Sequence, residues 1–178
     1  MKNLNLLLAG FGGQGILFAG KIAAYVGMIL NKEISWLPSY GPEMRGGTAN
    51  CTVCISDEEI GAPNVPNPNA FVVMNLPSFD KFINEVESGG TVVIDSSLID
   101  KKVERKDLNV FYVPASELAE KNNIVGLANV VLVSKLFHEL KFASMEIIDK
   151  AIEFCVPKSK ENMLDMNKQA ARIGACFA

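Results

Sequence analysis

Short apolar runs and helically spaced apolar residues alternate along the first half of the chain. The short runs end at glycine, proline or polar residues, as is typical of strands buried in a sheet. Apolar residues at helical spacing predict helices over 14–30 and 78–87. Six runs predict strands: 4–9, 34–37, 48–55, 71–74, 91–94 and 110–113.

The second half of the chain has a different pattern, because helically spaced apolar positions continue from 116 to 174. Early alternation followed by helices predicts an α/β fold. We expect a Rossmann-like, open, mostly parallel sheet with helices on both faces and a helical C-terminal part. No internal repeat or linker divides the 178 residues, so we expect a single domain over 1–178.

Composition limits the function classes that this fold can serve. The chain has 49% hydrophobic residues and a formal net charge of −3, which gives no electrostatic footprint for nucleic acid or an anionic membrane. No apolar stretch approaches the roughly 18 residues of a membrane-spanning helix. The single histidine, His138, excludes a site that needs two imidazoles. Four cysteines are too sparse for a disulfide framework, so we expect a reducing cytoplasm.

A glycine-rich turn follows the first predicted strand and precedes the first predicted helix. Its sequence fits the pattern G-x-G-x-x-G: Gly10-Phe11-Gly12-Gly13-Gln14-Gly15. Glycine permits the tight turn and lets a ligand approach the backbone at a helix N-terminus, which suits a phosphate. A dinucleotide site also needs an acid at the end of the second strand, yet Glu33 stands at its beginning. The alternative is that the glycines only let the helix pack closely on the sheet.

A second glycine-rich loop follows the second predicted strand: Ser39-Tyr40-Gly41-Pro42-Glu43-Met44-Arg45-Gly46-Gly47. An arginine beside two glycines combines a cationic fork with accessible N–H groups, which suits a phosphate or carboxylate. A solvated loop with glycines for its turns is the alternative. The loop follows a strand as the glycine turn does, so we expect both at the same edge of the sheet.

The remaining candidates for chemistry are cysteines and single polar residues. Cys51 and Cys54 have C-x-x-C spacing, and Cys155 and Cys176 complete four potential metal ligands. Residues three apart on a strand point to opposite faces, so we interpret all four as structural and expect no metal site. Asp95 ends a predicted strand, where it either belongs to a site or caps the next turn. We expect His138 to be a surface or core residue and assign no catalytic residue to this chain.

Taken together, the two glycine motifs resemble the gamma subunit of 2-oxoacid:ferredoxin oxidoreductases. The resemblance covers nearly the whole chain and includes the segments 9–15, 39–47, 55–60 and 93–97. The loop 39–43 is most similar to that of the 2-oxoglutarate and branched 2-oxoacid members, and less similar to that of the pyruvate members. Which 2-oxoacid is used stays open, since most of its pocket would lie on other chains.

The resemblance implies that this chain acts within a multisubunit enzyme. That enzyme oxidatively decarboxylates a 2-oxoacid with coenzyme A, giving an acyl-CoA, carbon dioxide and reduced ferredoxin. Thiamine diphosphate, Mg²⁺ and the iron–sulfur clusters would lie on alpha, beta and ferredoxin-like delta subunits, and the isolated chain would be inactive. The residues expected to face the active site, near the coenzyme A phosphates, are Gly10, Gly12, Gly13, Gln14, Gly15, Arg45, Gly46 and Gly47.

Two other functions fit the same strand, turn and helix. One is a stand-alone oxidoreductase that binds NAD(P) or flavin, and the other is a nucleotide-sensing module. Both predict that the isolated chain binds a nucleotide, whereas a subunit should purify with larger chains. A homodimer of the isolated chain also stays open, because two copies could bury the apolar surface that partner subunits would otherwise cover.

Overall fold

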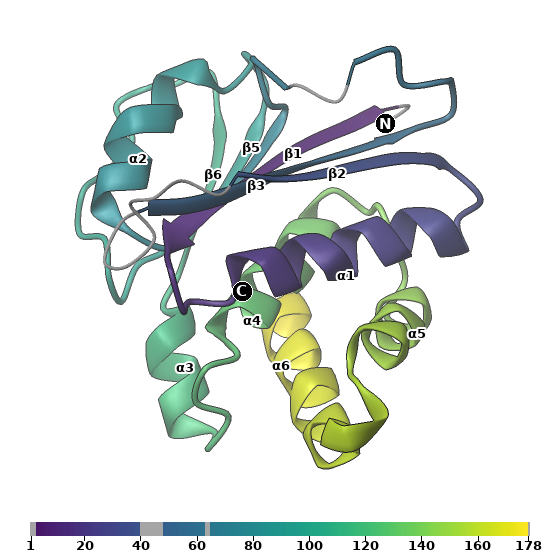
Figure 1. Cartoon of the computed structure of the whole chain (residues 1–178). Helices are drawn as coiled ribbons and strands as arrows, with labels where there is room; N and C mark the ends of the chain where they lie inside the picture. Colours follow the sequence, from purple (N-terminus) through teal and green to yellow (C-terminus); the bar gives the residue numbers. More distant parts are fainter. Residues whose placement is uncertain (1–2, 40–47, 63–64, 178) are drawn as a thin grey trace.

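The computed structural model describes residues 3–39, 48–62 and 65–177 (Figure 1). Every predicted strand is confirmed, and the helical second half contains four α-helices within these ranges. The strands are β1 (Asn3–Phe11), β2 (Glu33–Ser39), β3 (Thr48–Ser56), β4 (Ala70–Val73), β5 (Thr91–Asp95) and β6 (Asn109–Val113). The helices are α1 (Ile16–Ile29), α2 (Leu76–Phe82), α3 (Ala115–Lys121), α4 (Ala128–Glu139), α5 (Met145–Cys155) and α6 (Leu164–Cys176), with 3₁₀ turns η2 (Ile83–Glu85) and η3 (Lys158–Met163).

The six strands form one sheet in the order β2-β3-β1-β4-β5-β6. β1, β4, β5 and β6 pair in parallel, whereas β3 pairs antiparallel with both β1 and β2. Only eight residues join β2 to β3, too few for the crossover that a parallel pair needs. Five strands therefore run in one direction and β3 in the other, which confirms a mostly parallel open sheet.

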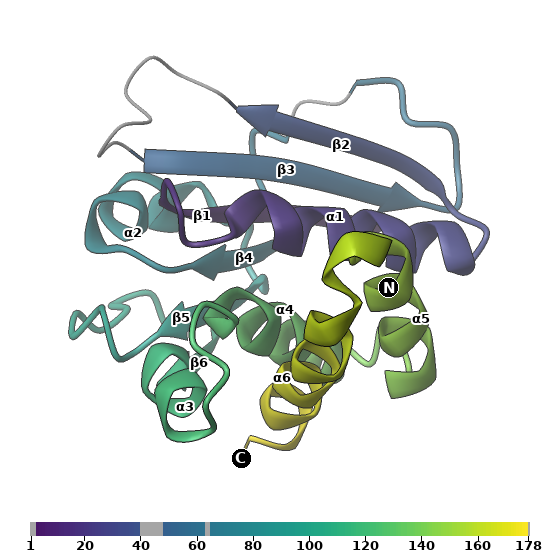
Figure 2. The same cartoon turned by 60° about the horizontal axis from the view of Figure 1, so that its bottom comes forward.

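Helices cover both faces of this sheet, as predicted (Figures 1 and 2). Alternate residues of β1 separate two cores, because successive side chains of a strand point to opposite faces. Leu4, Leu6 and Leu8 pack in the larger core with α1, α4, α5 and α6. Leu7 and Ala9 face the smaller core beneath α2. Helices α4, α5 and α6 of the second half therefore pack on the same face of the sheet as α1.

The predicted helix over 78–87 is divided in the structure. Its α-helical part, α2, begins after Asn75, whose side chain accepts a hydrogen bond from the Ser78 amide at 2.9 Å. The helix ends at Phe82 and continues as the 3₁₀ turn η2. The cap residue Asn75 places the start of α2 directly after β4.

Helices α4 and α6 approach each other very closely. A Cβ atom added at Gly174 would lie 2.0 Å from the carbonyl oxygen of Val131, so only glycine allows this backbone separation. Lys135 of α4 is buried and donates a hydrogen bond to the Phe177 carbonyl just after α6. The last helix is therefore held against the rest of the fold at its C-terminal end.

Candidate functional site

The glycine turn lies at the point where the chain switches faces of the sheet. From the carboxyl end of β1 the chain continues into α1 on one face, and from the adjacent β4 it continues into α2 on the other. Ligands of open α/β sheets bind in the crevice at this position. The predicted glycine residues are thus placed where such a fold recognises its ligands.

The conformation of the turn depends on glycine at two positions. Gly13 and Gly15 have φ of 94° and 76°, in the left-handed region that other residues rarely adopt. Gly15 is the N-cap of α1, and neither a side-chain cap nor an acidic residue neutralises the first turn of this helix. The N-terminal end of α1 is therefore available to an anion at the carboxyl edge of the sheet.

The Gln14 side chain links this turn to Met74, the residue that follows β4. Its Oε1 accepts a hydrogen bond from the Phe11 amide at 2.5 Å, and its Nε2 donates to the Met74 carbonyl at 3.1 Å. A Cβ atom at Gly10 would lie 2.7 Å from Gln14 Oε1, so glycine makes room for this side chain. The Gln14 carboxamide thus occupies one backbone donor of the turn and ties β1 to the end of β4.

Asn129 is a member of the site that sequence patterns did not indicate. It is 2% exposed and donates from Nδ2 to the Gly15 carbonyl at 2.9 Å. A Cβ atom at Gly15 would lie 2.6 Å from the same nitrogen. The first turn of α4 therefore fixes the first turn of α1, across 114 positions in the sequence.

Two small pockets flank the turn. One, of about 210 Å³, is lined by Gly13, Gln14 and Met74 together with Glu120 and Val125. The other, of about 240 Å³, lies across the turn and is lined by Phe11, Gly12, Gly15, Phe18 and Ala49 among others. The structure thus brings Gly12, Gly13, Gln14 and Gly15 together at one surface, whereas Gly10 is buried beneath the turn and lines neither pocket.

Arg45, Gly46 and Gly47 lie outside the described residues. The residues on either side of their loop are described: Ser39 ends β2, and Thr48 begins β3 and pairs with Phe11. Both flanking residues are at the carboxyl edge of β1. The loop therefore starts and finishes at the edge that carries the glycine turn.

Large apolar side chains are exposed around the same edge. Phe11 is the last residue of β1, Leu76 begins α2, Leu98 follows β5, and Val125 precedes α4. Their exposed fractions are 39%, 43%, 46% and 71%, respectively. We call these four residues the apolar rim. Exposed apolar groups that surround a polar site are typical of a surface covered by another protein.

Asp95 caps a turn, one of the two roles that its position allowed. The carboxylate is fully buried at the end of β5 and accepts hydrogen bonds from the Ser97 amide at 3.1 Å and the Ser116 hydroxyl at 2.7 Å. These bonds join the turn after β5 to the start of α3. His138 is exposed in the last turn of α4, away from the glycine turn.

Cys51 and Cys54 point to opposite faces of β3, as the strand argument predicts. Cys51 packs beneath α1, where burial raises the pKa of its thiol to about 12. Cys54 lines a pocket on the other face. In the described ranges no group of three or more histidine, cysteine, aspartate or glutamate residues could hold a metal ion.

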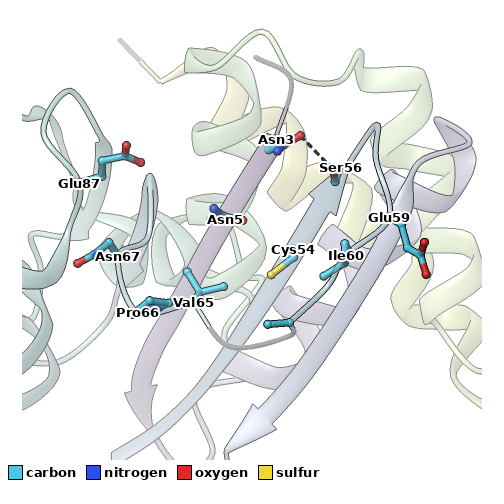
Figure 3. Close-up of a pocket in the computed structure, with 11 residues that line it drawn as sticks. Asn3, Asn5, Cys54, Ser56, Glu59, Ile60, Val65, Pro66, Asn67 and Glu87 are labelled. Carbon is cyan, nitrogen blue, oxygen red and sulfur yellow. Dashed lines mark hydrogen bonds between the residues drawn. The ribbon is translucent and has the colours of Figure 1, made fainter.

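The pocket at Cys54 lies at the opposite edge of the sheet from the glycine turn (Figure 3). It has a volume of about 470 Å³, and its strand residues come from the start of β1 and the end of β3. Ser56 donates to Asn3 Oδ1 at 3.0 Å across its floor. Nothing in the sequence patterns indicated this pocket, and its two acids, Glu59 and Glu87, are exposed.

The sheet order counts against a dinucleotide site. Such a site takes its ribose-binding acid from the end of a second strand that lies parallel and adjacent to the first. Here β3 separates β2 from β1, and β2 ends at Ser39. The Phe11 amide is also already bound by Gln14. No helix within the described residues is long and apolar enough to cross a membrane.

Comparison with known proteins identifies a family. The model described as "Pyruvate ferredoxin/flavodoxin oxidoreductase" matches residues 5–176. The chain is 37% identical over 172 residues to ketoisovalerate oxidoreductase subunit VorA of Methanothermobacter thermautotrophicus, covering 96% of this chain but 35% of VorA. It is 36% identical over 166 residues to 2-oxoglutarate synthase subunit KorC of Methanocaldococcus jannaschii, covering 90% and 89% of the two chains. The chain therefore spans about a third of VorA and most of KorC.

Solved structures share this fold over the whole chain. The gamma subunit of a keto/oxoacid ferredoxin oxidoreductase from Geobacter sulfurreducens superimposes with a TM-score of 0.85 at 25% identity, covering 98% of this chain and 95% of that one. The 2-oxoglutarate:ferredoxin oxidoreductase from Magnetococcus marinus, solved with 2-oxoglutarate, coenzyme A and succinyl-CoA, gives 0.83 at 21% identity. The match covers 100% of this chain and 32% of that one, and at this identity it supports the fold alone.

Proposed function

Because the chain belongs to the pyruvate ferredoxin/flavodoxin oxidoreductase family as a gamma-type domain, we propose that it works as one part of an assembled 2-oxoacid:ferredoxin oxidoreductase. The assembled enzyme would convert a 2-oxoacid, coenzyme A and oxidised ferredoxin into an acyl-CoA, carbon dioxide and reduced ferredoxin. Relatives named for ketoisovalerate and 2-oxoglutarate favour a branched 2-oxoacid or 2-oxoglutarate as substrate.

The observation that carries this proposal is the carboxyl edge of the sheet. There the glycine turn and the uncapped N-terminus of α1 adjoin the apolar rim of Phe11, Leu76, Leu98 and Val125. Burying such side chains against a partner contributes roughly 1.5–3 kcal/mol each when burial is complete. We therefore assign this edge to the interface with the alpha and beta subunits.

The glycine residues 10, 12, 13 and 15, with Gln14, would then face the partner-held active site, together with Arg45, Gly46 and Gly47 from the adjoining loop. Backbone N–H groups at a helix N-terminus and a guanidinium are both suited to phosphate. We propose that they lie near the phosphates of coenzyme A. A protein of the same fold, from Magnetococcus marinus, was solved with that co-substrate bound.

The cofactors of the reaction would be held elsewhere in the assembly. Thiamine diphosphate, Mg²⁺ and the iron–sulfur clusters belong, in this proposal, to the alpha, beta and delta subunits. This chain would contribute binding surface and no catalytic residue, so by itself it would not turn over substrate. In this proposal the assembly works in the cytoplasm, the compartment that the sparse cysteines favour.

Co-purification tests the proposal directly. A tagged chain expressed at native level should recover larger chains that contain thiamine diphosphate and iron–sulfur clusters. The recovered assembly should reduce ferredoxin with 3-methyl-2-oxobutanoate or 2-oxoglutarate and coenzyme A. Recovery of the chain alone, or saturable binding of NAD or flavin to it, would overturn the proposal in favour of a stand-alone module.

A further inference from the structure

The Asn129 side chain is buried although only one of its two polar atoms is hydrogen-bonded. Its Nδ2 donates to the Gly15 carbonyl at 2.9 Å, and the residue is 2% exposed. Its Oδ1 is buried as well and accepts no hydrogen bond from the described residues. A buried polar atom without a partner costs free energy, and native structures contain few of them. The asparagine is therefore an expensive way to fill this position.

The Gly15 carbonyl does not need Asn129 as its donor. It also accepts the first helical hydrogen bond of α1, from the Ala19 amide at 3.0 Å. A leucine at position 129 has a similar shape, would leave the Gly15 carbonyl with this second partner, and would remove the unpartnered oxygen. Stability alone therefore does not account for asparagine at this position.

The second hydrogen bond fixes the direction of the peptide unit that opens α1. The Gly15 carbonyl and the Ile16 N–H belong to the same rigid, planar unit and point in opposite directions. The Ile16 N–H lies in the first turn of the helix, so it has no intrahelical partner. Donors from both α1 and α4 hold the carbonyl, and they thereby aim this N–H out of the helix at the carboxyl edge of the sheet.

The backbone donors beside this peptide unit are also unoccupied. The amides of Gly12, Gly13 and Gly15 donate no hydrogen bond to the described residues. Glycine has the greatest backbone freedom of all residues, so a glycine turn keeps its donors in one arrangement only if other groups hold it. Gln14 holds one side of the turn through Met74, and Asn129 holds the other side from α4. Donors that are already ordered bind a ligand without a further entropic cost.

We propose that Asn129 is a positioning residue for coenzyme A. It holds the peptide unit between Gly15 and Ile16, and thus the free amides of the turn, in the arrangement that receives a phosphate. Asn129 lies behind the turn and does not itself touch the ligand. This inference rests on the proposed function, which places the phosphates of coenzyme A at this turn.

Kinetics of the assembled enzyme separate positioning from a structural role. Asn129→Leu should raise the KM for coenzyme A about tenfold and leave kcat and the KM for the 2-oxoacid unchanged, because only the binding of one substrate is weakened. The urea midpoint of the chain should not fall, since the Gly15 carbonyl keeps the Ala19 amide. A purely structural role predicts the reverse, with a lower midpoint and an unchanged KM.

Asn167 provides a matched control within the same chain. It is also 2% exposed, its Nδ2 donates to the Met163 carbonyl at 2.8 Å, and its Oδ1 has no partner among the described residues. Asn167→Leu therefore makes the same chemical change in α6, without contact with the turn, and should leave the KM for coenzyme A unchanged. Asn129→Ser is the second test variant, because its smaller side chain fits the site even if leucine disturbs the fold. It should raise the same KM.

NMR relaxation of the full chain measures the turn without any partner subunit. The backbone amides of Gly13 and Ile16 should have order parameters near 0.85 in the parent chain, as in rigid backbone. In Asn129→Leu these values should fall toward 0.6, whereas Asn167→Leu should leave them as in the parent. Unchanged order parameters in both variants would show that the turn is rigid without Asn129 and would refute the proposal.

The kinetic results can also refute the proposal. In an assembly whose parent depends on coenzyme A, an unchanged KM in both Asn129 variants, or an equal rise in Asn167→Leu, would overturn the role of Asn129 alone. A parent assembly that turns over a 2-oxoacid without coenzyme A would instead overturn the proposed function. The parent and the variants therefore distinguish the two failures.

Discussion

The Asn129 carboxamide donates a hydrogen bond to the Gly15 carbonyl, joining the start of α4 to the start of α1. Asn129 is buried, and Gly15 is held in a left-handed conformation at φ 76°. Gly15 belongs to the glycine turn, so this contact holds the turn against α4. It therefore links the edge proposed for docking to the helical layer of the fold.

Replacing Gly15 with alanine should destabilise the fold more than the same change at Gly13. Both positions have positive φ, which costs an alanine about 1–2 kcal/mol. A Cβ atom at Gly15 also meets Asn129 Nδ2 at 2.6 Å, whereas a Cβ atom at Gly13 meets nothing within 4 Å. Urea unfolding should show an additional loss of about 1–3 kcal/mol for Gly15→Ala. Equal losses of unfolding free energy in the two variants would mean that the Asn129 side chain moves aside at no cost in free energy.

Val125→Asp should weaken association with the partner subunits while leaving the chain folded. Val125 is 71% exposed in the apolar rim, so a carboxylate there costs little in the free chain but would be desolvated in an interface. We expect at least about a tenfold loss of affinity by surface plasmon resonance. Met28→Asp, at a 56% exposed position near the far end of α1, is the matched control. Unchanged association of Val125→Asp would place the interface elsewhere.

Arg45→Ala in the assembled enzyme should weaken coenzyme A, raising its KM about tenfold or more. A guanidinium bound to a phosphate contributes about 1.5–3 kcal/mol, and alanine removes it. Arg172→Ala is the control, because Arg172 is half exposed and pairs with Asp149 on the surface of the helical layer. If both the KM for coenzyme A and subunit association stay unchanged, the loop has no role at the coenzyme A phosphates.

Stability should fall at low pH partly through Asp107. Its hydrogen bond and ion pair with Arg105 lower its pKa from 3.8 to about 2. The folded-state pKa is below the unfolded value, so this stabilisation is present above pH 3.8 and lost as pH falls toward 2. The free energy of unfolding, measured with urea, should fall less between pH 5 and pH 2 in Asp107→Asn than in the parent chain. Asp100→Asn is the control, because Asp100 is exposed and has no ion pair among the described residues. Its free energy of unfolding should fall between pH 5 and pH 2 by as much as that of the parent chain.

Local periodicity was sufficient to predict most of the elements. Apolar runs such as 91–94 are buried on both faces of the sheet, so their pattern alone indicated strands. The position of the glycine turn between β1 and α1 was also predicted from local pattern. Its backbone has positive φ at residues 13 and 15, and glycine adopts this conformation most readily. The prediction of separate faces for Cys51 and Cys54 needed only the two-residue period of a strand.

Other features depended on contacts that no local pattern encodes. The antiparallel place of β3 between β2 and β1 was not predicted, because strand pairing is decided by which edges meet after the helices pack. The role of Gln14 became visible only with the Met74 carbonyl beside it, 60 positions away.

The sequence by itself determined the elements, the glycine turn and the family resemblance, because these depend on residue types at short spacing. Only the tertiary structure decided that Gly15 and Asn129, in the first turns of α1 and α4, are joined by a hydrogen bond. The physical reason is that helix packing, here through the close contact of Gly174 with Val131, brings together residues whose separation in the chain carries no signal.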